Sequence, residues 1–501
     1  MAKRIMFQGT GSTVGKSLTV AAMCRILKDM GYSVAPFKSQ NMALNSFITK
    51  DGKEMGRAQV VQAEAARIEP HVYMNPILLK PTSYVGSQVI LNGEVYRNMK
   101  AAEYFTKKDF LIPHIKTAFN ALNAEYDVIV IEGAGSPAEI NLRSRDIVNM
   151  GLAEMVDTDV ILIGDVDKGG VFASLYGTVK LLSESEQKRI KGFLINKFRG
   201  DVSLLMPGVE MLEEKIGIPC VGVIPYIEKL KIDDEDSVTE RFGKKRNAAL
   251  TIGVVKLPYM SNFSDFTVFD MEDDVNLIYV DDLEAMRTCD ALIIPGSKNT
   301  IYDMLSLSKS GIDAGIKAFH QTGKPIIGIC GGYQILGRKI SDPFEVESID
   351  PTIDGLGLLD VVTEMAKEKK TVQNEGVIKN GLASYKALKV GGYEIHMGES
   401  KRLNELTVPF IQTLDGHEDG AVNSAKTVFG TYFHGIFDND AFRRAFINTL
   451  REQKGLAPLA ESVDFAAAKN AEYDRLAKHV KDNLNMDQMM QILEESRTNA
   501  C

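Results

Sequence analysis

A glycine-rich stretch near the start constrains what this chain can fold into more than any other feature. It follows the apolar run Ile5–Phe7, precedes a helix-forming run and consists of Gly9-Thr10-Gly11-Ser12-Thr13-Val14-Gly15-Lys16-Ser17. Strand, glycine turn and helix in this order predict a phosphate-binding loop, in which backbone N–H groups face anionic oxygens at a helix N-terminus. The alternative, an ordinary glycine turn, does not account for the Gly-Lys-Ser sequence at the helix start.

The residue types of this loop suggest ATP and Mg²⁺ as its ligands. We expect Lys16 to contact the terminal phosphates and the Ser17 hydroxyl to ligate Mg²⁺. The phosphate-binding residues are then expected to be Gly11, Ser12, Thr13, Val14, Gly15, Lys16 and Ser17. Thr10 stands where the standard P-loop has its first glycine, so Gly9 and Gly15 lie one residue further apart than usual. This departure from the standard glycine spacing argues against the standard P-loop family and favours a smaller one.

Composition narrows the class of protein. The chain has 501 residues, 45% of them hydrophobic, so a globular protein of about two to four domains is expected. Its 58 basic and 67 acidic residues give a net charge of −9, which argues against a general nucleic-acid or membrane-surface binder. The five cysteines lack metal-ligand spacing, and no signal peptide or membrane-spanning run is evident. We therefore expect a cytoplasmic protein.

The first half alternates short apolar runs with helical stretches. Continuous apolar strands between helices predict an α/β fold with a parallel sheet covered on both faces. The expected strands after Ile5–Phe7 are residues 33–37, 127–131, 159–163, 192–195 and 220–224.

Functional residues of such a sheet are expected just past the carboxyl ends of its strands. Glu132, followed by Gly133-Ala134-Gly135, is expected to be a Mg²⁺ ligand beside Ser17, with helix capping as the alternative. Asn196 is a candidate for binding adenine, although a turn-forming role is equally consistent. Lys38, Asp165 and Asp167 also follow predicted strands.

A change of composition separates the chain into domains. Residues 228–249 are charged and poor in apolar residues, as expected of a solvated linker, and a second strand–helix series begins at Leu250. The expected division is an ATP-binding domain at 1–227, the linker at 228–249, a second α/β domain at 250–445 and a helical extension at 446–501.

The second domain contains a candidate nucleophile. Gly328-Ile329-Cys330-Gly331-Gly332 has the form of a nucleophile elbow with cysteine in place of serine. The helix N-terminus behind it would stabilise a thiolate, and the Gly331 N–H would face an oxyanion, with a second donor from Gly296-Ser297. A buried structural cysteine is the alternative, and it is the preferred interpretation for Cys24, Cys220 and Cys289.

A cysteine nucleophile requires a base, and the seven histidines compete for this role. His434 follows the strand-like run Val428–Phe433 and precedes a glycine, so it is expected to project from a strand end. His396, in an apolar strand, is the rival, although packing or substrate contact is the commoner role for such a histidine.

The residues now identify a family. The first half resembles dethiobiotin synthetase and its relatives in the loop spacing, in Lys38 and in Glu132–Gly135, and the second half resembles class I glutamine amidotransferases. Both halves in this order resemble the cobyrinate amidotransferases, a match that covers nearly the whole chain. The supporting stretches are 36–45, 79–82, 86–90, 164–173, 392–398 and 430–435.

The resemblance implies an ATP- and glutamine-dependent ligase that amidates the b, d, e and g carboxylates of adenosylcobyrinic acid a,c-diamide. Its partners would be small molecules, the corrinoid being a substrate and not a prosthetic group. Because the corrinoid is polyanionic, cationic residues are candidates to bind it, although surface charge explains the two arginines equally well: Lys38, Lys80, Arg143, Arg145 and Lys168.

One position departs from the general amidotransferase pattern. Those enzymes usually have a glutamate two residues after the catalytic histidine, where this chain has Ile436. We therefore expect a Cys330–His434 dyad, with the group that orients the imidazole left open.

Two alternatives remain at this stage. The a,c-diamide synthases of the same family use the same machinery on a different pair of carboxylates. A partitioning-type switch ATPase also has a deviant P-loop, but it carries a second lysine early in that loop, where this chain has Thr10, Gly11 and Ser12. The oligomeric state does not follow from the sequence.

Overall fold

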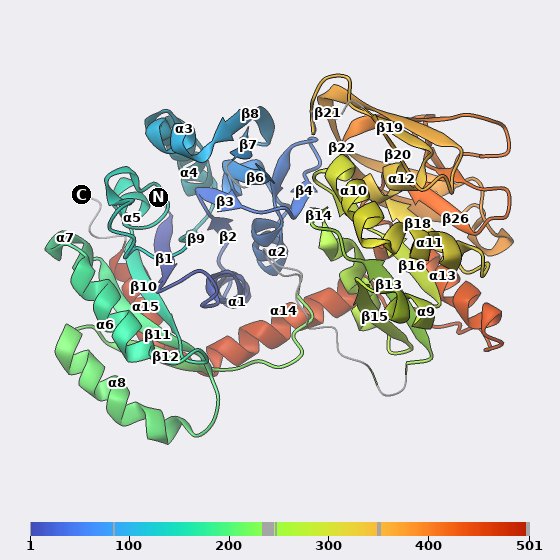
Figure 1. The fold of residues 1–501 in the computed structure, drawn as a ribbon. Coiled ribbons are helices and arrows are strands. Elements are labelled where there is room, and N and C mark those ends of the chain that lie inside the picture. Colours follow the sequence, from blue (N-terminus) through green and yellow to red (C-terminus); the bar gives the residue numbers. More distant parts are fainter. Residues whose placement is uncertain (1, 84–85, 233–244, 246–247, 348–351, 497–501) are drawn as a thin grey trace. The chain divides into compact units, whose positions relative to one another are not determined.

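The computed structural model describes residues 2–83, 86–232, 245, 248–347 and 352–496 (Figure 1). The chain forms two compact units. Unit 1 comprises Met1–Ala43, Glu54–Glu235 and Lys469–Cys501, and unit 2 comprises Leu44–Lys53 and Asp236–Ala468. The expected contiguous domains differ from this division at two segments, because a short early segment groups with unit 2 and the C-terminal residues group with unit 1. Most of the expected linker, 233–244 and 246–247, lies outside the described residues.

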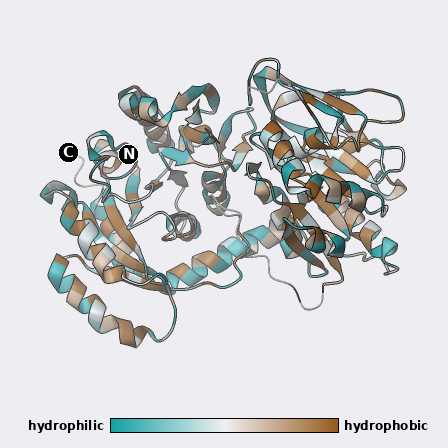
Figure 2. Ribbon diagram, viewed as in Figure 1, coloured by the Kyte–Doolittle hydropathy of each residue, from teal (hydrophilic) through white to brown (hydrophobic). Residues whose placement is uncertain are grey.

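The main sheet of unit 1 is parallel, as predicted. Its strand order is β12-β11-β10-β1-β9-β2. Every residue of β9 and β10 is buried, because helices cover both faces of the sheet. Figure 2 shows these strands as hydrophobic. The strands are β1 Lys3–Gly9, β2 Val34–Phe37, β9 Val128–Glu132, β10 Asp159–Asp165, β11 Ile190–Phe198 and β12 Cys220–Pro225.

Unit 1 includes α15 and most of α14, because it resumes at Lys469. Side chains of α14 and α15 share one apolar core with α1, so the end of the chain completes the nucleotide-binding unit. The helices are α1 Lys16–Asp29, α2 Arg57–Ala65, α3 Ala101–Thr106, α4 Ile112–Glu125, α5 Met150–Met155, α6 Val171–Leu181, α7 Glu184–Gln187, α8 Val202–Ile216, α14 Phe465–Lys481 and α15 Met486–Glu495.

Unit 1 also contains a smaller sheet that the sequence did not predict. Its order is β3-β6-β7-β8, with β3 parallel to β6 and the remaining pairs antiparallel. Its strands are β3 Gln40–Met42, β6 Ile77–Ser83, β7 Gly86–Leu91 and β8 Glu94–Lys100, and β5 Glu54–Gly56 precedes α2.

The central sheet of unit 2 has the order β15-β13-β16-β18-β26-β25, and its pairs are parallel except at β25. This arrangement places the ends of β18 and β26 side by side. The strands are β13 Leu250–Val255, β15 Val275–Val280, β16 Ala291–Ile294, β18 Ile326–Ile329, β25 Ala421–Val422 and β26 Val428–Thr431. The helices are α9 Leu283–Thr288, α10 Thr300–Ser310, α11 Ile312–His320, α12 Gly331–Leu336 and α13 Asp440–Gln453, with 3₁₀ turns η4 Phe263–Met271 and η6 Ile436–Asp438.

A long antiparallel hairpin forms the second sheet of unit 2. β21 Val361–Ile378 pairs with β22 Lys389–Arg402 from Val361↔Arg402 to Val377↔Lys389. The short strands of this unit are β4 Ser46–Ile48, β14 Met260–Ser261, β17 Gly296–Ser297, β19 Lys339–Ser341, β20 Thr352–Asp354, β23 Ile411–Thr413 and β24 Glu418–Asp419.

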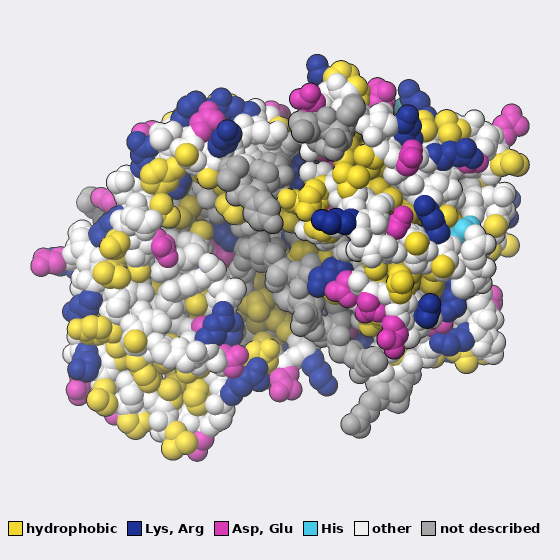
Figure 3. Space-filling view, in the orientation of Figure 1, with side chains coloured by type: hydrophobic (Ala, Val, Ile, Leu, Met, Phe, Trp, Pro, Cys, Tyr) yellow, Lys and Arg dark blue, Asp and Glu magenta, His cyan; other side chains and the backbone are white. Residues whose placement is uncertain are grey.

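The surface agrees with the charge balance of the sequence. On the visible face, acidic and basic side chains are interspersed over both units (Figure 3). No helix in the described part of the chain is both long and apolar enough to cross a membrane.

Candidate active sites

The glycine-rich loop lies between β1 and α1. Lys16 folds back over it, and Nζ donates to the carbonyl oxygens of Gly11 (2.8 Å) and Gly135 (3.1 Å). Gly15 has φ 99°, and a Cβ at this position would collide with Nδ2 of Asn196. The loop therefore needs glycine here for both its conformation and its packing.

Glu132, at the end of β9, brings the predicted metal ligands together. Its Oε1 accepts hydrogen bonds from Ser17 Oγ at 2.8 Å and from Lys38 Nζ at 3.0 Å, while Oε2 accepts one from Gln62 Nε2 at 2.5 Å. The carboxylate is 1% exposed and so must be balanced by these partners. Sequence reasoning missed Gln62, which lies in the middle of α2 among other buried polar residues.

Two further lysines reach the loop from neighbouring strand ends. Lys168 donates to Oγ1 of Thr13 at 2.7 Å. Lys197, which the sequence did not single out, donates to the Thr13 carbonyl at 2.5 Å and to Asp165 at 2.8 Å. Asn196 donates to the Val14 carbonyl at 2.9 Å, so its amide supports the loop; contact with adenine stays a prediction.

The structure gives the other three predicted substrate cations separate surroundings. Lys80 is 4% exposed and pairs with the buried Glu54 at 2.9 Å. Arg143 pairs with Glu186. Arg145 donates to the Phe105 carbonyl at 2.9 Å. Of the predicted set, Lys38 contacts Glu132 and Lys168 contacts the phosphate loop.

The donor set beside the loop suits Mg²⁺. No group of three His, Cys, Asp or Glu side chains that could hold a metal occurs in the described ranges. Mg²⁺ does not need one, because it keeps several waters and binds through one or two protein oxygens plus substrate phosphates. Ser17 and Glu132 supply two oxygens 2.8 Å apart at the helix N-terminus where phosphates would lie.

Cys330 occupies the strained turn expected of a nucleophile elbow. It follows β18, begins α12 and has φ 52° and ψ −109°, unusual for a residue other than glycine. Its N–H donates to the Thr431 carbonyl of β26 at 2.8 Å. This bond holds the elbow beside the strand that leads to His434, and the thiol donates to the Ile395 carbonyl at 3.5 Å.

Asp265 orients His434. Imidazole Nδ1 donates to Asp265 Oδ2 at 2.7 Å, and the Gly435 N–H donates to Oδ1 at 2.9 Å, so one carboxylate fixes both the ring and the backbone. Burial alone would lower the pKa of His434, but the charges of Asp265 and Cys330 outweigh it and raise this pKa to about 10. The arrangement favours the charged imidazolium form of His434.

The expected dyad is therefore extended by a carboxylate that sequence reasoning missed. Asp265 lies in η4, which follows β13 and β14, and no motif marks it. The one available signal was its position: it comes after the first strand of the second series, in a polar sequence between Phe263 and Phe266.

His396, the rival base, has both ring nitrogens engaged. Nε2 contacts Glu394 at 3.0 Å, Nδ1 contacts the Gly398 carbonyl at 2.8 Å, and the ring stacks on Tyr432. Burial would raise the pKa of Glu394, but hydrogen bonds from His396 and Lys370 lower it to about 2. His396 is thus held by Glu394 through a hydrogen bond and by Tyr432 through ring stacking.

The predicted oxyanion residues lie close together. A Cβ at Gly331 would stand 2.8 Å from the Ser297 nitrogen, and one at Gly296 would stand 3.1 Å from Cε1 of His434. Ser297 Oγ donates to Asp303 at 2.6 Å, and burial raises the pKa of this aspartate to about 6. The β17 backbone is thus packed against both the elbow and the imidazole.

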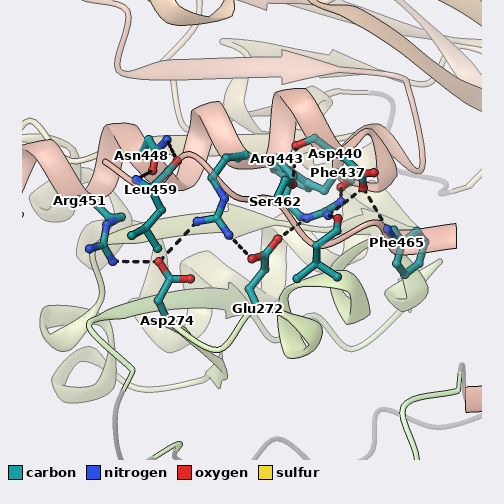
Figure 4. Close-up of polar contacts among 12 residues, drawn as sticks. Glu272, Asp274, Phe437, Asp440, Arg443, Asn448, Arg451, Leu459, Ser462 and Phe465 are labelled. Atoms are coloured by element: carbon teal, nitrogen blue, oxygen red, sulfur yellow. Dashed lines mark hydrogen bonds and ion pairs between the residues drawn. The ribbon is translucent and has the colours of Figure 1, made fainter. Parts of the chain in front are cut away.

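A buried cluster of ion pairs fixes the C-terminal end of η4. Glu272 caps this element and accepts from Arg443 Nε at 2.7 Å and from Arg444 of α13. Figure 4 shows Arg443 between Glu272 and Asp440, and it also donates to the Phe437 carbonyl at 2.9 Å. Because η6 and α13 follow His434 directly, this cluster fastens the element carrying Asp265 to the segment carrying the imidazole.

The comparisons with known proteins agree with this geometry. Residues 5–239 match the CobQ/CobB/MinD/ParA nucleotide binding domain, and residues 251–442 match the CobB/CobQ-like glutamine amidotransferase domain. The chain therefore combines a P-loop nucleotide-binding domain with a glutamine amidotransferase domain.

Full-length relatives identify the family. The chain is 53% identical to the cobyric acid synthase of Clostridium acetobutylicum over 98% of both chains. It is 52% identical to that of Thermoanaerobacter sp. over 99% of both chains, and 53% identical to that of Clostridium botulinum over 98% of this chain and 99% of the relative. The chain belongs to the cobyric acid synthase family.

Proposed function

We propose that this protein uses ATP and glutamine to amidate the b, d, e and g carboxylates of adenosylcobyrinic acid a,c-diamide. One observation carries the proposal: a cysteine elbow beside a histidine that an aspartate orients occurs in the same chain as a phosphate-binding loop. Glutamine hydrolysis supplies ammonia, and phosphoryl transfer prepares the carboxylate that receives it.

In unit 2, the glutaminase unit, His434 takes the proton of the Cys330 thiol. The resulting thiolate attacks the amide carbon of glutamine. The oxyanion accepts hydrogen bonds from the backbone near Gly331 and Gly296-Ser297. His434 then protonates the leaving nitrogen, ammonia departs, and water hydrolyses the glutamyl thioester. Asp265 holds Nδ1 protonated, so that Nε2 faces the sulfur throughout.

In the nucleotide-binding unit, a corrinoid carboxylate oxygen attacks the γ-phosphorus of ATP, and ADP leaves. Ammonia then displaces phosphate from the acyl phosphate to give the amide. Lys16, Lys38 and Lys168 surround the loop with positive charge that stabilises the transferring group, and Ser17 with Glu132 would hold Mg²⁺.

The test is to incubate the purified protein with ATP, Mg²⁺, glutamine and the a,c-diamide, and to identify the amidated positions by mass spectrometry. Conversion at b, d, e and g is expected, and none should occur with Cys330→Ser when glutamine is the nitrogen source. An a,c-diamide synthase would leave this substrate unchanged and amidate cobyrinic acid instead, which would contradict the proposal.

A further inference from the structure

Leu44–Lys53 belongs to unit 2, although its sequence lies inside the nucleotide-binding half. The chain leaves unit 1 after Ala43 and returns at Glu54. The segment contains β4 and closes a turn in which the Thr49 N–H donates to the Lys53 carbonyl at 2.8 Å. Asn45 and Ile48 are 0% exposed. This excursion is therefore an integral part of the glutaminase unit.

The segment fixes the start of η4, which carries Asp265. Asn45 Oδ1 accepts from the Phe263 N–H at 3.0 Å, and Asn262 Oδ1 accepts from the Ser46 N–H at 3.2 Å. Asn262 caps η4 in the left-handed conformation, at φ 52° and ψ 43°. The direction in which η4 starts therefore depends on these two hydrogen bonds.

The same segment also holds the neighbour of His434. Tyr393 exchanges two backbone hydrogen bonds with His434, of 2.9 and 3.1 Å, and its ring stacks on the imidazole. The Tyr393 hydroxyl donates to the Ser46 carbonyl at 3.2 Å and accepts from Asn262 Nδ2 at 3.3 Å. Residues 44–53 thus contact both the start of η4, which carries Asp265, and Tyr393, which packs against His434.

Asn262 is also connected to the predicted oxyanion residues. It directly follows β14, whose Ser261 pairs with Gly296 of β17. A Cβ at Gly296 would stand 3.3 Å from the Ser261 carbonyl oxygen, so this junction is closely packed. A shift of Asn262 would therefore affect η4 and β17 together.

The chemistry of Asn45 favours positioning over simple packing. Its Nδ2 is buried and makes no hydrogen bond among the described residues, whereas Oδ1 is used. Asn45 thus supplies one hydrogen-bond acceptor, Oδ1, to the N–H of Phe263, which lies two residues before Asp265.

We propose that Asn45 is a positioning residue of the glutaminase centre, and that it acts through Phe263 and η4 to hold Asp265 against His434. This inference rests on the glutaminase activity proposed above. Asn45 follows β3 of unit 1, which ends at Met42. A residue from the nucleotide-binding half of the sequence would therefore help to position Asp265 and His434. Glutamine hydrolysis would accordingly depend on how this part of the chain is held.

The test compares Asn45→Ala with Asn380→Ala in the full-length protein. Asn380 is the matched control, because its Nδ2 donates to the Pro409 carbonyl at 2.7 Å elsewhere in unit 2. For Asn45→Ala we expect kcat for glutamine hydrolysis to fall about 10-fold or more, with KM for glutamine within about 2-fold of wild type. Amidation with ammonium should stay unchanged, and Asn380→Ala should resemble wild type in every assay.

A double-mutant cycle tests whether Asn45 acts through Asp265. In an Asp265→Asn background, Asn45→Ala should lower kcat little further, since coupled residues are non-additive. Equal kcat values for Asn45→Ala and Asn380→Ala, or full additivity with Asp265→Asn, would overturn the inference. If the alanine variant fails to fold, Asn45→Ser, too short to reach Phe263, replaces it. A wild-type protein without Cys330-dependent glutamine hydrolysis would instead overturn the proposed function, and this inference with it.

Discussion

His434 Nδ1 lies 2.7 Å from Asp265 Oδ2, although 169 positions of sequence separate the two residues. They are 1% and 2% exposed, so water does not screen the interaction. The same carboxylate accepts the Gly435 N–H, which sets the backbone as well as the ring. The pair fixes which nitrogen faces Cys330 and favours the charged imidazole that a thiolate requires.

Replacing Asp265 with asparagine should separate glutamine hydrolysis from amidation. The amide cannot balance the imidazolium, so the pKa of His434 should fall, and kcat for glutamine hydrolysis should drop about 10²-fold. The limb of the pH profile that reports His434 should move to lower pH. Steady-state glutaminase assays across pH measure both effects. An unchanged profile would show that Asp265 does not act on the base.

Replacing Lys16 with alanine should abolish amidation with either nitrogen source. Phosphoryl transfer depends on charge around the transferring group, and Lys16 is the loop's own cation. Amide product is measured by mass spectrometry with glutamine and with ammonium. Lys116→Ala, an exposed lysine of α4, is the control. Normal ammonium-dependent turnover of Lys16→Ala would exclude the loop as the phosphate site.

Much of the fold follows from local sequence. The apolar runs of both halves form the expected parallel strands, because burial on two faces leaves a continuous apolar pattern that a short window reveals. The hairpin of β21 and β22 lacks such a pattern: the stretch 366–370 is Ala-Lys-Glu-Lys-Lys, and the register of the two strands shifts between Met365 and Lys370.

The site could be predicted where one short stretch contains both the reactive residue and the glycines that shape its turn, as in the loop at Lys16 and the elbow at Cys330. It could not be predicted where the partner is remote. Asp265, Gln62 and Asn45 each contact residues far along the chain, and no spacing rule encodes such contacts. The packing of α14 and α15 in unit 1 could not be predicted for the same reason, because these helices contact residues that are remote in the sequence.

Replacing Cys330 with serine should remove glutamine-dependent synthesis and spare synthesis from ammonium. A serine hydroxyl at its ordinary pKa lacks the nucleophilicity of a thiolate, whereas the acyl phosphate is expected to form in the other unit. Product is measured with each nitrogen source, at a pH where free ammonia is appreciable. Cys220→Ser, a site where burial raises the thiol pKa to about 11, is the control. Loss of both activities in a folded Cys330→Ser protein would contradict the two-site mechanism.

The last prediction concerns the pH dependence of stability. Asp419 of β24 accepts hydrogen bonds from Thr431 and from the Tyr432 N–H (3.1 Å), in the segment that leads to His434. Burial raises its pKa from 3.8 to about 7, even though the Thr431 hydroxyl opposes the shift. Between these values the folded chain holds a proton that the unfolded chain has released. This contribution to stability is therefore fully present below about pH 3.8 and lost as the pH rises to about 7.

Asp419→Asn cannot titrate; its Oδ1 can still accept from the Tyr432 N–H, and its Nδ2 can donate to the Thr431 hydroxyl. Its free energy of unfolding should therefore fall less steeply than that of wild type as the pH rises from about 4 to 7. Urea denaturation at several pH values measures the slope. Asp273→Asn, at an exposed position, controls for loss of one carboxylate and should follow the wild-type slope. If Asp419→Asn and wild type give the same slope, Asp419 is already ionised in the folded protein across this range.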